Sequence, residues 1–211
     1  MLSVVIPTNN ETDNPFFMRT LQSLSQFNQI EVICIDKSDA PSRAERLNIG
    51  FQRATGSMIL FHHPRSYLDP QGIQFLLENK NKKFWGGFTH KFDVNHPLLK
   101  FTSWYSNRIR GQRQGVIYLD HCIFFHRSLW LGPLPSIEIF EDTILSQNLN
   151  RQLPIVILPF VSETAAIRFT KNGIWWQSFM NQILKLGFHL GISHDKMNRI
   201  YERGLNLNSK N

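Results

Sequence analysis

The sequence is poor in cysteine and has no long apolar run. Two cysteines among 211 residues exclude a disulfide-rich scaffold and a cysteine-based zinc module. Cys34 and Cys122 each stand in an apolar segment, so we expect two buried thiols. No apolar stretch reaches the roughly 18 residues that span a bilayer, and no signal-like segment precedes the first strand pattern. These absences predict a cytoplasmic protein.

Acidic residues are fewer than basic ones. The chain has 23 Lys and Arg against 16 Asp and Glu, a net charge of +7, which points to an anionic partner such as a nucleotide phosphate, a nucleic acid or a membrane surface. Residues 80–113 hold eight basic residues and one acid, with aromatic residues between them. This stretch fits a solvated face, peripheral contact with an anionic membrane, or attraction of a lipid-phosphate acceptor. No nucleic-acid-binding signature accompanies it, so we expect no nucleic acid partner.

Apolar segments and helical patterns alternate in the first eighty residues. The apolar segments cover residues 3–6, 30–35 and 57–62, and the helical patterns cover residues 16–27, 41–54 and 70–79. Short apolar strands joined by helical crossovers are typical of a parallel sheet buried on both faces. Polar residues follow each strand, and such sheets bind ligands at the carboxyl ends of their strands, so we expect one shared site there.

The second half predicts a less regular arrangement. Strand patterns cover residues 84–92, 116–125 and 154–161, and helical patterns cover residues 141–149, 175–190 and 193–203. Asn14, Asp39 and Asp69 are predicted to cap helices, the first and last because Pro follows each.

Six short motifs follow one another along the chain. They are SVVIPTNNE at 3–11, IDKSD at 35–39, RAERLNIG at 43–50, GSMILF at 56–61, DHCIF at 120–124 and ED at 141–142. In this order and spacing they resemble the family 2 glycosyltransferases of the GT-A fold. The chain is most similar to a small bacterial subgroup of transferase-2-like proteins, and the resemblance covers about residues 1–204.

The resemblance implies a fold and a division of the chain. The fold is α/β of the GT-A, Rossmann-like type, with a mixed, mainly parallel sheet flanked by helices and followed by C-terminal helices. Residues 1–204 form a single domain, and residues 205–211 form a frayed tail. Within the domain, residues 1–80 are the nucleotide-binding half, 81–170 the acceptor half and 171–204 the C-terminal helices.

The resemblance also implies a reaction, the inverting transfer of a sugar from a nucleoside-diphosphate sugar to an acceptor hydroxyl. Asp142 would be the general base, with Glu141 beside it. The donor would be bound by a set of residues at the strand ends and on the next helix, namely Pro7, Thr8, Glu11, Asp36, Ser38, Arg43, Asn48 and Arg65. The acceptor or the donor sugar would contact Asp120, His121 and Arg168. The plain structural alternatives are an acidic first helical turn for residues 141–142 and an Asx turn for Asp36.

One departure from the family concerns its metal site. Arg65 stands where the family has an aspartate that binds a divalent cation, Mn²⁺ or Mg²⁺. Arg65 could bind the diphosphate itself, because guanidinium groups pair bidentately with phosphate. Alternatively His62 or His63 could ligate a softer cation, and only one could do so because neighbouring strand residues point to opposite faces. A third alternative is a non-catalytic protein that binds a nucleotide sugar or another partner.

Overall fold

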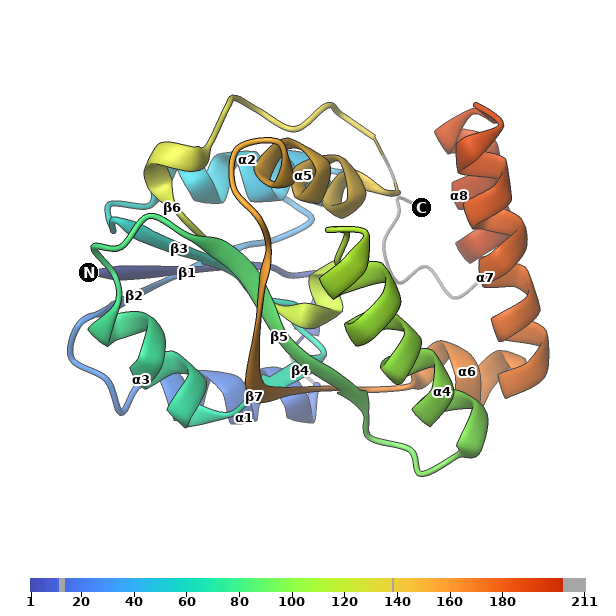
Figure 1. Ribbon diagram of the computed structural model, residues 1–211, viewed down its shortest axis with the longest axis horizontal. Coiled ribbons are helices and arrows are strands. Elements are labelled where there is room, and N and C mark those ends of the chain that lie inside the picture. The colour runs from blue at the N-terminus through green and yellow to red at the C-terminus, as the bar shows by residue number, and fades with distance from the viewer. Residues whose placement is uncertain (12–13, 138, 203–211) are drawn as a thin grey trace.

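A seven-stranded mixed sheet forms the centre of the computed structural model, which describes residues 1–11, 14–137 and 139–202 (Figure 1). The strands lie in the order β2-β1-β3-β6-β5-β7-β4. Their bounds are β1 Leu2–Pro7, β2 Ile30–Ile35, β3 Met58–Phe61, β4 Ser66–Leu68, β5 Trp85–Phe92, β6 Ile123–His126 and β7 Val156–Thr164. β6 and β4 pair antiparallel with their neighbours, and the other strands run in one direction, which confirms a mixed, mainly parallel sheet.

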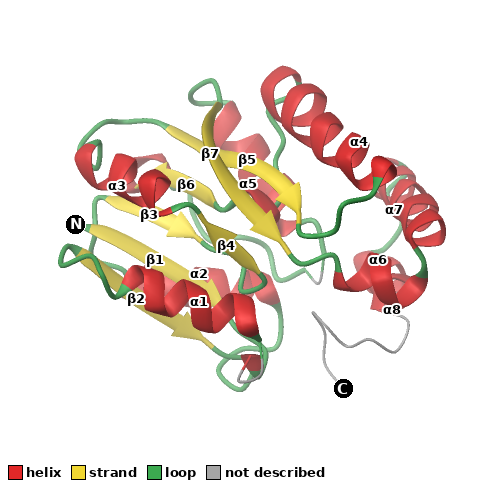
Figure 2. Ribbon diagram, turned by 90° about the horizontal axis from the view of Figure 1, so that it is seen from below, coloured by secondary structure: helices red, strands yellow, loops and turns green. Residues whose placement is uncertain are grey.

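Helices cover both faces of the sheet (Figures 1 and 2). α2 (Arg43–Arg53) and α5 (Glu141–Asn150) lie on one face, and α1 (Pro15–Leu24) and α3 (Pro70–Glu78) lie on the other. Successive side chains of β1 divide between the two apolar cores, because a strand presents alternate residues to opposite faces. Val5 packs with Leu47 of α2, whereas Val4 and Ile6 pack with the α1 and α3 side.

Local capping explains where the first helices begin. Asn14 caps α1 through hydrogen bonds from the backbone N–H groups of residues 16 and 17, and Asp69 caps α3, as predicted. The prediction for Asp39 is wrong. Ser42 caps α2 in a reciprocal pair with Glu45, and the Asp39 carboxylate instead accepts the backbone N–H of Asp36.

Two predicted strands differ from the structure. The pattern at 116–125 yields a strand only from residue 123, because residues 119–121 form a 3₁₀ turn and Cys122 has a φ of 52°. Before that turn, the backbone N–H and C=O of Ile117 both pair with the Ser146 hydroxyl rather than with a strand. The second strand, β2, is not buried on both faces, because it lies at the edge of the sheet, and Cys34 on it is exposed.

Several elements follow β5 that the sequence patterns do not predict. They are α4 (Pro97–Tyr105), the π-helix η2 (Ser106–Arg113) and α6 (Ile167–Asn172). The short strand β4, which precedes β5, is not predicted either. The two C-terminal helices are α7 (Ile174–His189) and α8 (His194–Glu202). Arg203, Gly204 and the predicted frayed tail 205–211 lie outside the described residues.

The basic residues of the stretch 80–113 do not form one patch. Lys82 and Lys83 precede β5, whereas Lys91 lies at its far end and the arginines follow on η2. An eight-residue strand separates its ends by roughly 25 Å, so the charges divide between two regions of the molecule.

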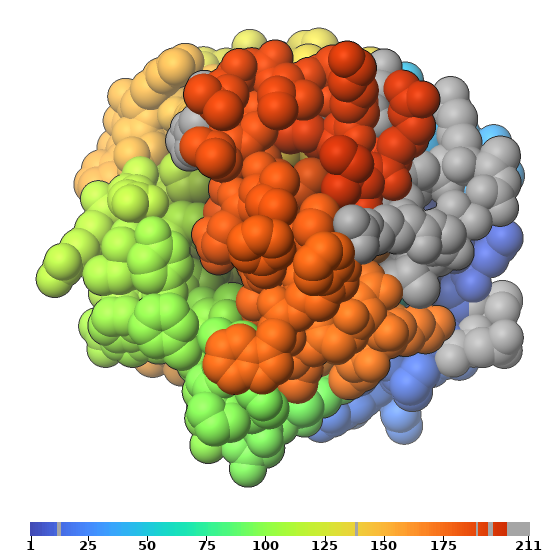
Figure 3. All heavy atoms as spheres, turned by 90° about the vertical axis from the view of Figure 1, so that its right-hand side faces the viewer, coloured from blue at the N-terminus to red at the C-terminus, as the bar shows by residue number. Residues whose placement is uncertain are grey.

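Large apolar side chains are exposed on α4, on α7 and just after α7, which share one side of the molecule (Figure 3). α7 turns Met180 and Leu184 inward and leaves its other apolar face in solvent. The exposed members of this α4–α7 surface are Phe101, Trp104, Tyr105, Trp175, Trp176, Phe179, Ile183, Leu186, Leu190 and Ile192. In the part of the chain that the structure describes, no helix is long and apolar enough to cross a membrane.

Candidate functional site

A cavity of about 200 Å³ lies between the carboxyl end of β3 and the C-terminal helices. Its walls come from both halves of the chain: the loop after β3, α2, β5, η2, the start of α5, and α6 to α8. The polar residues that line it are Arg43, His63, Arg65, His90, Thr102, Ser106, Arg110, Tyr118, Asp120, Asp142, Thr164, Arg168, Asn181, Lys185 and Tyr201.

The lining of the cavity is strongly basic. Four arginines and one lysine face two aspartates, and burial holds the pKa of both lining histidines below its usual value. For His90 the pKa falls to about 3, through burial and then the charge of Arg110. Both imidazoles are therefore neutral at pH 7, and the cavity has an excess of positive charge that favours an anion.

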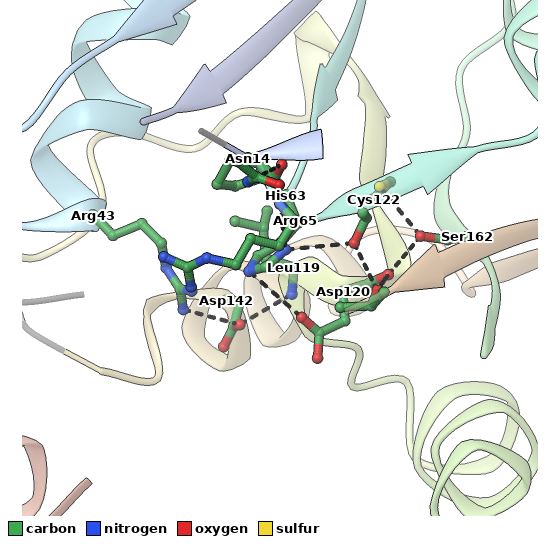
Figure 4. A network of polar contacts seen from close by, with 12 residues as sticks. Asn14, Arg43, His63, Arg65, Leu119, Asp120, Cys122, Asp142 and Ser162 are labelled. Carbon is green, nitrogen blue, oxygen red and sulfur yellow. Dashed lines mark hydrogen bonds and ion pairs between the residues drawn. The ribbon is translucent and has the colours of Figure 1, made fainter. Parts of the chain in front are cut away.

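Arg43 joins the two carboxylates at the start of α5. Its Nε donates to Glu141 Oε1, and its Nη2 lies 3.5 Å from Asp142 Oδ2 (Figure 4). The side chain of Glu141 is fully buried and does not line the cavity. Glu141 therefore binds Arg43 on the side away from the cavity, whereas Asp142 is the one of these two carboxylates that lines the cavity.

Asp142 is buried but keeps one oxygen for chemistry. The backbone N–H of Leu119 donates to Oδ2 at 3.1 Å, the same oxygen that faces Arg43. Desolvation raises the pKa of Asp142 above its usual range and outweighs the opposing charge of Arg43. Among the described residues, both of these contacts use Oδ2, which leaves Oδ1 available to the hydroxyl proton of a ligand. A carboxylate with a raised pKa is the better base for that proton.

Arg65 occupies the end of the β3 loop, as the motif order predicts, and points into the cavity. Its Nη2 lies 3.4 Å from Glu11 Oε1, and the other oxygen of Glu11 accepts from the Asn14 side chain at 2.7 Å. Asn14 Nδ2 also donates to the Pro64 carbonyl at 3.0 Å. The cap of α1 therefore fixes the carboxylate that orients Arg65, and Glu11 itself does not line the cavity.

His63 and Asp120 form a second polar pair beside Arg65. The backbone N–H of Arg65 donates to His63 Nδ1 at 3.2 Å, so the ring proton is on Nε2, which lies 3.8 Å from Asp120 Oδ1. Desolvation raises the pKa of Asp120 despite the arginines around it. His62, one residue earlier, is fully buried and does not line the cavity, and burial lowers its pKa to about 4.

The ends of β1 and β2 meet in a turn organised by Asp36. Its carboxylate accepts from the Thr8 hydroxyl at 3.0 Å and from the backbone N–H groups of Asn10 and Ser38. Desolvation opposes ionisation of Asp36, but these hydrogen bonds prevail and lower its pKa. The structure thus brings Thr8, Asp36 and Ser38 together next to Pro7, the last residue of β1, but none of the four lines the cavity.

A chain of hydrogen bonds anchors Arg110, which the sequence does not single out. His121 Nδ1 lies 2.9 Å from the Phe88 carbonyl and must donate to it, so Nε2 accepts from the Ser106 hydroxyl at 2.8 Å. Ser106 Oγ in turn accepts from Arg110 Nη2, and the guanidinium lies 3.6 Å from the centroid of the Tyr118 ring. His121, predicted to contact a sugar, is thus buried behind Ser106 and outside the cavity.

The predicted site residues therefore fall into two groups. Those that the cavity brings together are Arg43, His63, Arg65, Asp120, Asp142 and Arg168. The others lie outside the cavity, and among them Asn48 has a structural role, because its side-chain amide forms hydrogen bonds with the backbone N–H and C=O of Leu134. Arg168 lies over the Tyr201 ring, 3.9 Å from its centroid, and donates to the Tyr201 carbonyl. The lining residues that the sequence analysis does not identify include Arg110, Tyr118 and Lys185. For Lys185, a sequence signal exists, because a lysine within the apolar α7 is unusual.

The residues at the end of β3 do not fit a divalent cation. Within the described residues, no group of three or more His, Cys, Asp or Glu side chains is arranged to hold a metal ion. Arg65 stands where the family that the motifs resemble has a carboxylate, and its permanent positive charge repels a cation and already faces Glu11.

Comparison with known proteins shows the fold of the chain. We found no matching family model and no matching sequence among curated proteins. A fragment of S. aureus TarS (1–349), solved with UDP-GlcNAc, is 13% identical over 97% of this chain and 71% of its own length, with a TM-score of 0.58. The mannosyltransferase PcManGT from Pyrobaculum calidifontis, solved with GDP-Man and Mn²⁺, is 14% identical over 98% and 69%, with a TM-score of 0.59.

These likenesses confirm the GT-A-type α/β fold that the motifs predict. Of the two structures named, PcManGT is described as a mannosyltransferase. The chain spans 43% of a longer solved TarS chain, which is therefore more than twice its length.

Proposed function

We propose that this chain is a glycosyltransferase that transfers a sugar from a nucleoside-diphosphate sugar to an acceptor hydroxyl, with inversion. The observation that carries the proposal is the cavity, in which Asp142 and basic side chains face one space at the carboxyl end of β3. The GT-A fold supports it, since two similar structures were solved with UDP-GlcNAc and GDP-Man.

The donor lies across the strand ends in this proposal. Its nucleoside contacts the Asp36 turn, and its diphosphate reaches Arg65, which supplies positive charge in place of a metal. A unit charge 4 Å from another is worth about 4 kcal/mol at an effective dielectric near 20, before desolvation. The Glu11 carboxylate reduces this gain but also holds the guanidinium in position, so less conformational entropy is lost on binding.

Asp142 is the general base. Its Oδ1 accepts the proton of the acceptor hydroxyl as the hydroxyl oxygen attacks the anomeric carbon from the face opposite the diphosphate. The bond from that carbon to the diphosphate oxygen breaks, and the nucleoside diphosphate leaves with the electron pair. One displacement of this kind inverts the anomeric carbon, and positioned base catalysis contributes roughly 10²–10⁴-fold in rate.

The test measures binding and turnover separately. UDP and GDP are added to the protein in thermal-shift titrations with and without EDTA, and sugar-nucleotide hydrolysis is followed for wild type and Asp142→Asn. We expect nucleotide binding that survives chelation, and turnover that Asp142→Asn lowers by roughly 10²–10⁴-fold. A thermal shift that disappears with EDTA would refute the role of Arg65 as the metal's replacement.

A non-catalytic protein that binds a nucleotide sugar is the second candidate. The ion pair of Arg65 with Glu11 favours it, because the pair leaves less positive charge to stabilise a departing diphosphate. The two candidates differ in one result: wild type and Asp142→Asn would then bind nucleotide equally and show the same negligible hydrolysis.

We propose further that the α4–α7 surface contacts an anionic membrane. Residues 94–119 and 164–194, which contain both helices, hold no Asp or Glu. Three of their seven basic residues line the cavity, and the other four are exposed, namely Lys100, Arg108, Arg113 and Lys171. Trp and Phe side chains on a basic, acid-free surface are suited to the interface of an anionic bilayer. Trp175 is 73% exposed and Phe179 57%, so insertion of these side chains removes large apolar areas from water.

Co-sedimentation with vesicles tests this contact. Vesicles of phosphatidylglycerol and phosphatidylcholine should bind the wild type, and Trp175→Ser with Phe179→Ser should weaken binding at least tenfold. Met18→Ser, on the exposed side of α1, is the control. Wild type that fails to bind at low salt, or that forms a dimer through the same residues, would refute it.

A further inference from the structure

The basic side chains of the cavity differ in how their charge is compensated. Arg43 forms ion pairs with Glu141 and Asp142, and Arg65 forms one with Glu11. Arg110 and Lys185 line the same cavity and form no ion pair with any residue that the structure describes. One part of the cavity wall therefore carries two positive charges without an acidic partner.

Arg110 is held rigidly in that wall. It projects from the π-helix η2, a rare conformation that often occurs at functional sites. The Tyr118 ring supports one face of the guanidinium, the Ser106 hydroxyl accepts from Nη2, and Nε is buried without a hydrogen bond within the described residues. An arginine fixed in this way is prepared for a ligand, because little side-chain freedom remains to be lost.

Lys185 is the single Lys or Arg in the sequence of the apolar helix α7, and it lines the same cavity as Arg110. Burial, together with the Arg110 charge, lowers the pKa of Lys185 to about 8. Two like charges that line one cavity repel each other, and a bound anion relieves that repulsion. Nothing in the packing of α7 requires a cation here, since its neighbours Met180 and Leu184 fill the apolar contacts.

We propose that Arg110 and Lys185 bind the phosphate group of an anionic acceptor. The inference rests on the proposed function, because it names the substrate class for the same cavity. The donor diphosphate belongs to the strand ends and Arg65, whereas Arg110 and Lys185 come from η2 and α7. Asp142 lines the cavity together with both sets of residues, so an acceptor phosphate held by Arg110 and Lys185 orients a hydroxyl toward its carboxylate.

Lys185 makes this binding dependent on pH. The other titratable and charged groups that line the cavity are Arg43, His63, Arg65, His90, Arg110, Tyr118, Asp120, Asp142, Arg168 and Tyr201. Burial raises the pKa of Tyr118 to about 12, so Tyr118 keeps its proton between pH 7 and 9. Lys185, with a pKa of about 8, loses its proton over the same range. A phosphate monoester is already a dianion over this range. Affinity for it therefore falls as pH rises through 8, and Lys185→Arg, which stays charged, removes the fall.

The experiment titrates glycerol 3-phosphate and, separately, UDP into wild type, Arg110→Gln, Lys185→Gln and Lys185→Arg by calorimetry. Arg108→Gln is the matched control, because Arg108 lies on the same π-helix with an exposed side chain that contacts Gln112. We expect at least a tenfold loss of glycerol 3-phosphate affinity in Arg110→Gln and Lys185→Gln and less than a twofold change for UDP. A short-chain phosphatidic acid in place of glycerol 3-phosphate shows whether the phosphate is that of a lipid or of a soluble molecule.

Each outcome decides the point. Equal glycerol 3-phosphate affinity in Arg110→Gln and Arg108→Gln overturns the subsite, as does a tenfold loss of UDP affinity in Arg110→Gln, which would assign the residue to the donor. A wild type that binds glycerol 3-phosphate through Arg110 but binds neither UDP nor GDP retains the subsite and refutes the proposed function. Circular dichroism melts of every variant separate a lost subsite from a lost fold.

Discussion

Removal of Arg43 should destabilise the protein through the carboxylate behind it. Glu141 is fully buried, and Arg43 is its ion-pair partner, so Arg43→Met leaves a buried negative charge without compensation. Breaking a buried pair on one side costs about 3–5 kcal/mol. A domain of this size loses about 2–4 °C in Tm per kcal/mol, so the expected fall is roughly 6–20 °C at pH 8.

The pH dependence of that loss tests its cause. Desolvation already raises the pKa of both Glu141 and Asp142, and removal of Arg43 raises it further. A group whose pKa is higher in the folded state destabilises the fold as pH rises through that pKa, because the folded protein must then bury a charge. The loss of unfolding free energy in Arg43→Met relative to wild type should thus be smallest near pH 5 and grow toward pH 8.

Urea and thermal unfolding at pH 5, 6.5 and 8 measure this deficit. Arg108→Met makes the same chemical change on an exposed side chain and should shift Tm by less than 2 °C, as expected for a surface site. Arg43→Met with Glu141→Gln should recover a large part of the loss, since it removes the buried charge. A deficit that is the same at all three pH values would refute the electrostatic explanation.

Three further outcomes follow from the site and the sheet. Asp142→Asn should lower turnover about 10²–10⁴-fold while nucleotide affinity stays within twofold, as measured by calorimetry beside a hydrolysis assay. The thermal shift produced by UDP or GDP should persist in excess EDTA, because Arg65 supplies the positive charge. Gly86→Ala should cost at least about 3 kcal/mol in urea melts, since the added Cβ would lie 1.7 Å from the Val156 carbonyl oxygen; a midpoint like that of wild type contradicts this.

The sheet and its first helices could be predicted from the sequence because each depends on neighbouring residues. Asn14 followed by Pro15 is a local signal for the start of a helix, and the apolar run of β1 is typical of a strand with two covered faces. The edge position of β2 depends on which strand pairs with which, so no local pattern shows that Cys34 is exposed. Likewise the hydroxyl of Ser146 replaces strand pairing for Ile117, and only tertiary contact brings these two residues together.

The site was predictable only in part for the same reason. Arg65 and Asp142 stand in motifs whose order is local information, and both line the cavity. Arg110 lies in a polar segment with a glycine one residue later, which has the composition of a loop. Its role depends on Ser106, four residues earlier, and on His121 in a different element, a contact that the sequence does not encode as a pattern.

Phe140, two residues before Asp142, connects the start of α5 to the C-terminal helices. Phe140 precedes α5 with a φ of 69°, a left-handed conformation that a bulky residue adopts only when its surroundings impose it. The surroundings are α7, since the Phe140 and Phe188 rings lie 4.6 Å apart, centroid to centroid, beside Leu184 and Met197. The same helix exposes its opposite face to solvent. α7 therefore does more than close one side of the cavity, because its contact with Phe140 also fixes the backbone from which α5 and Asp142 begin.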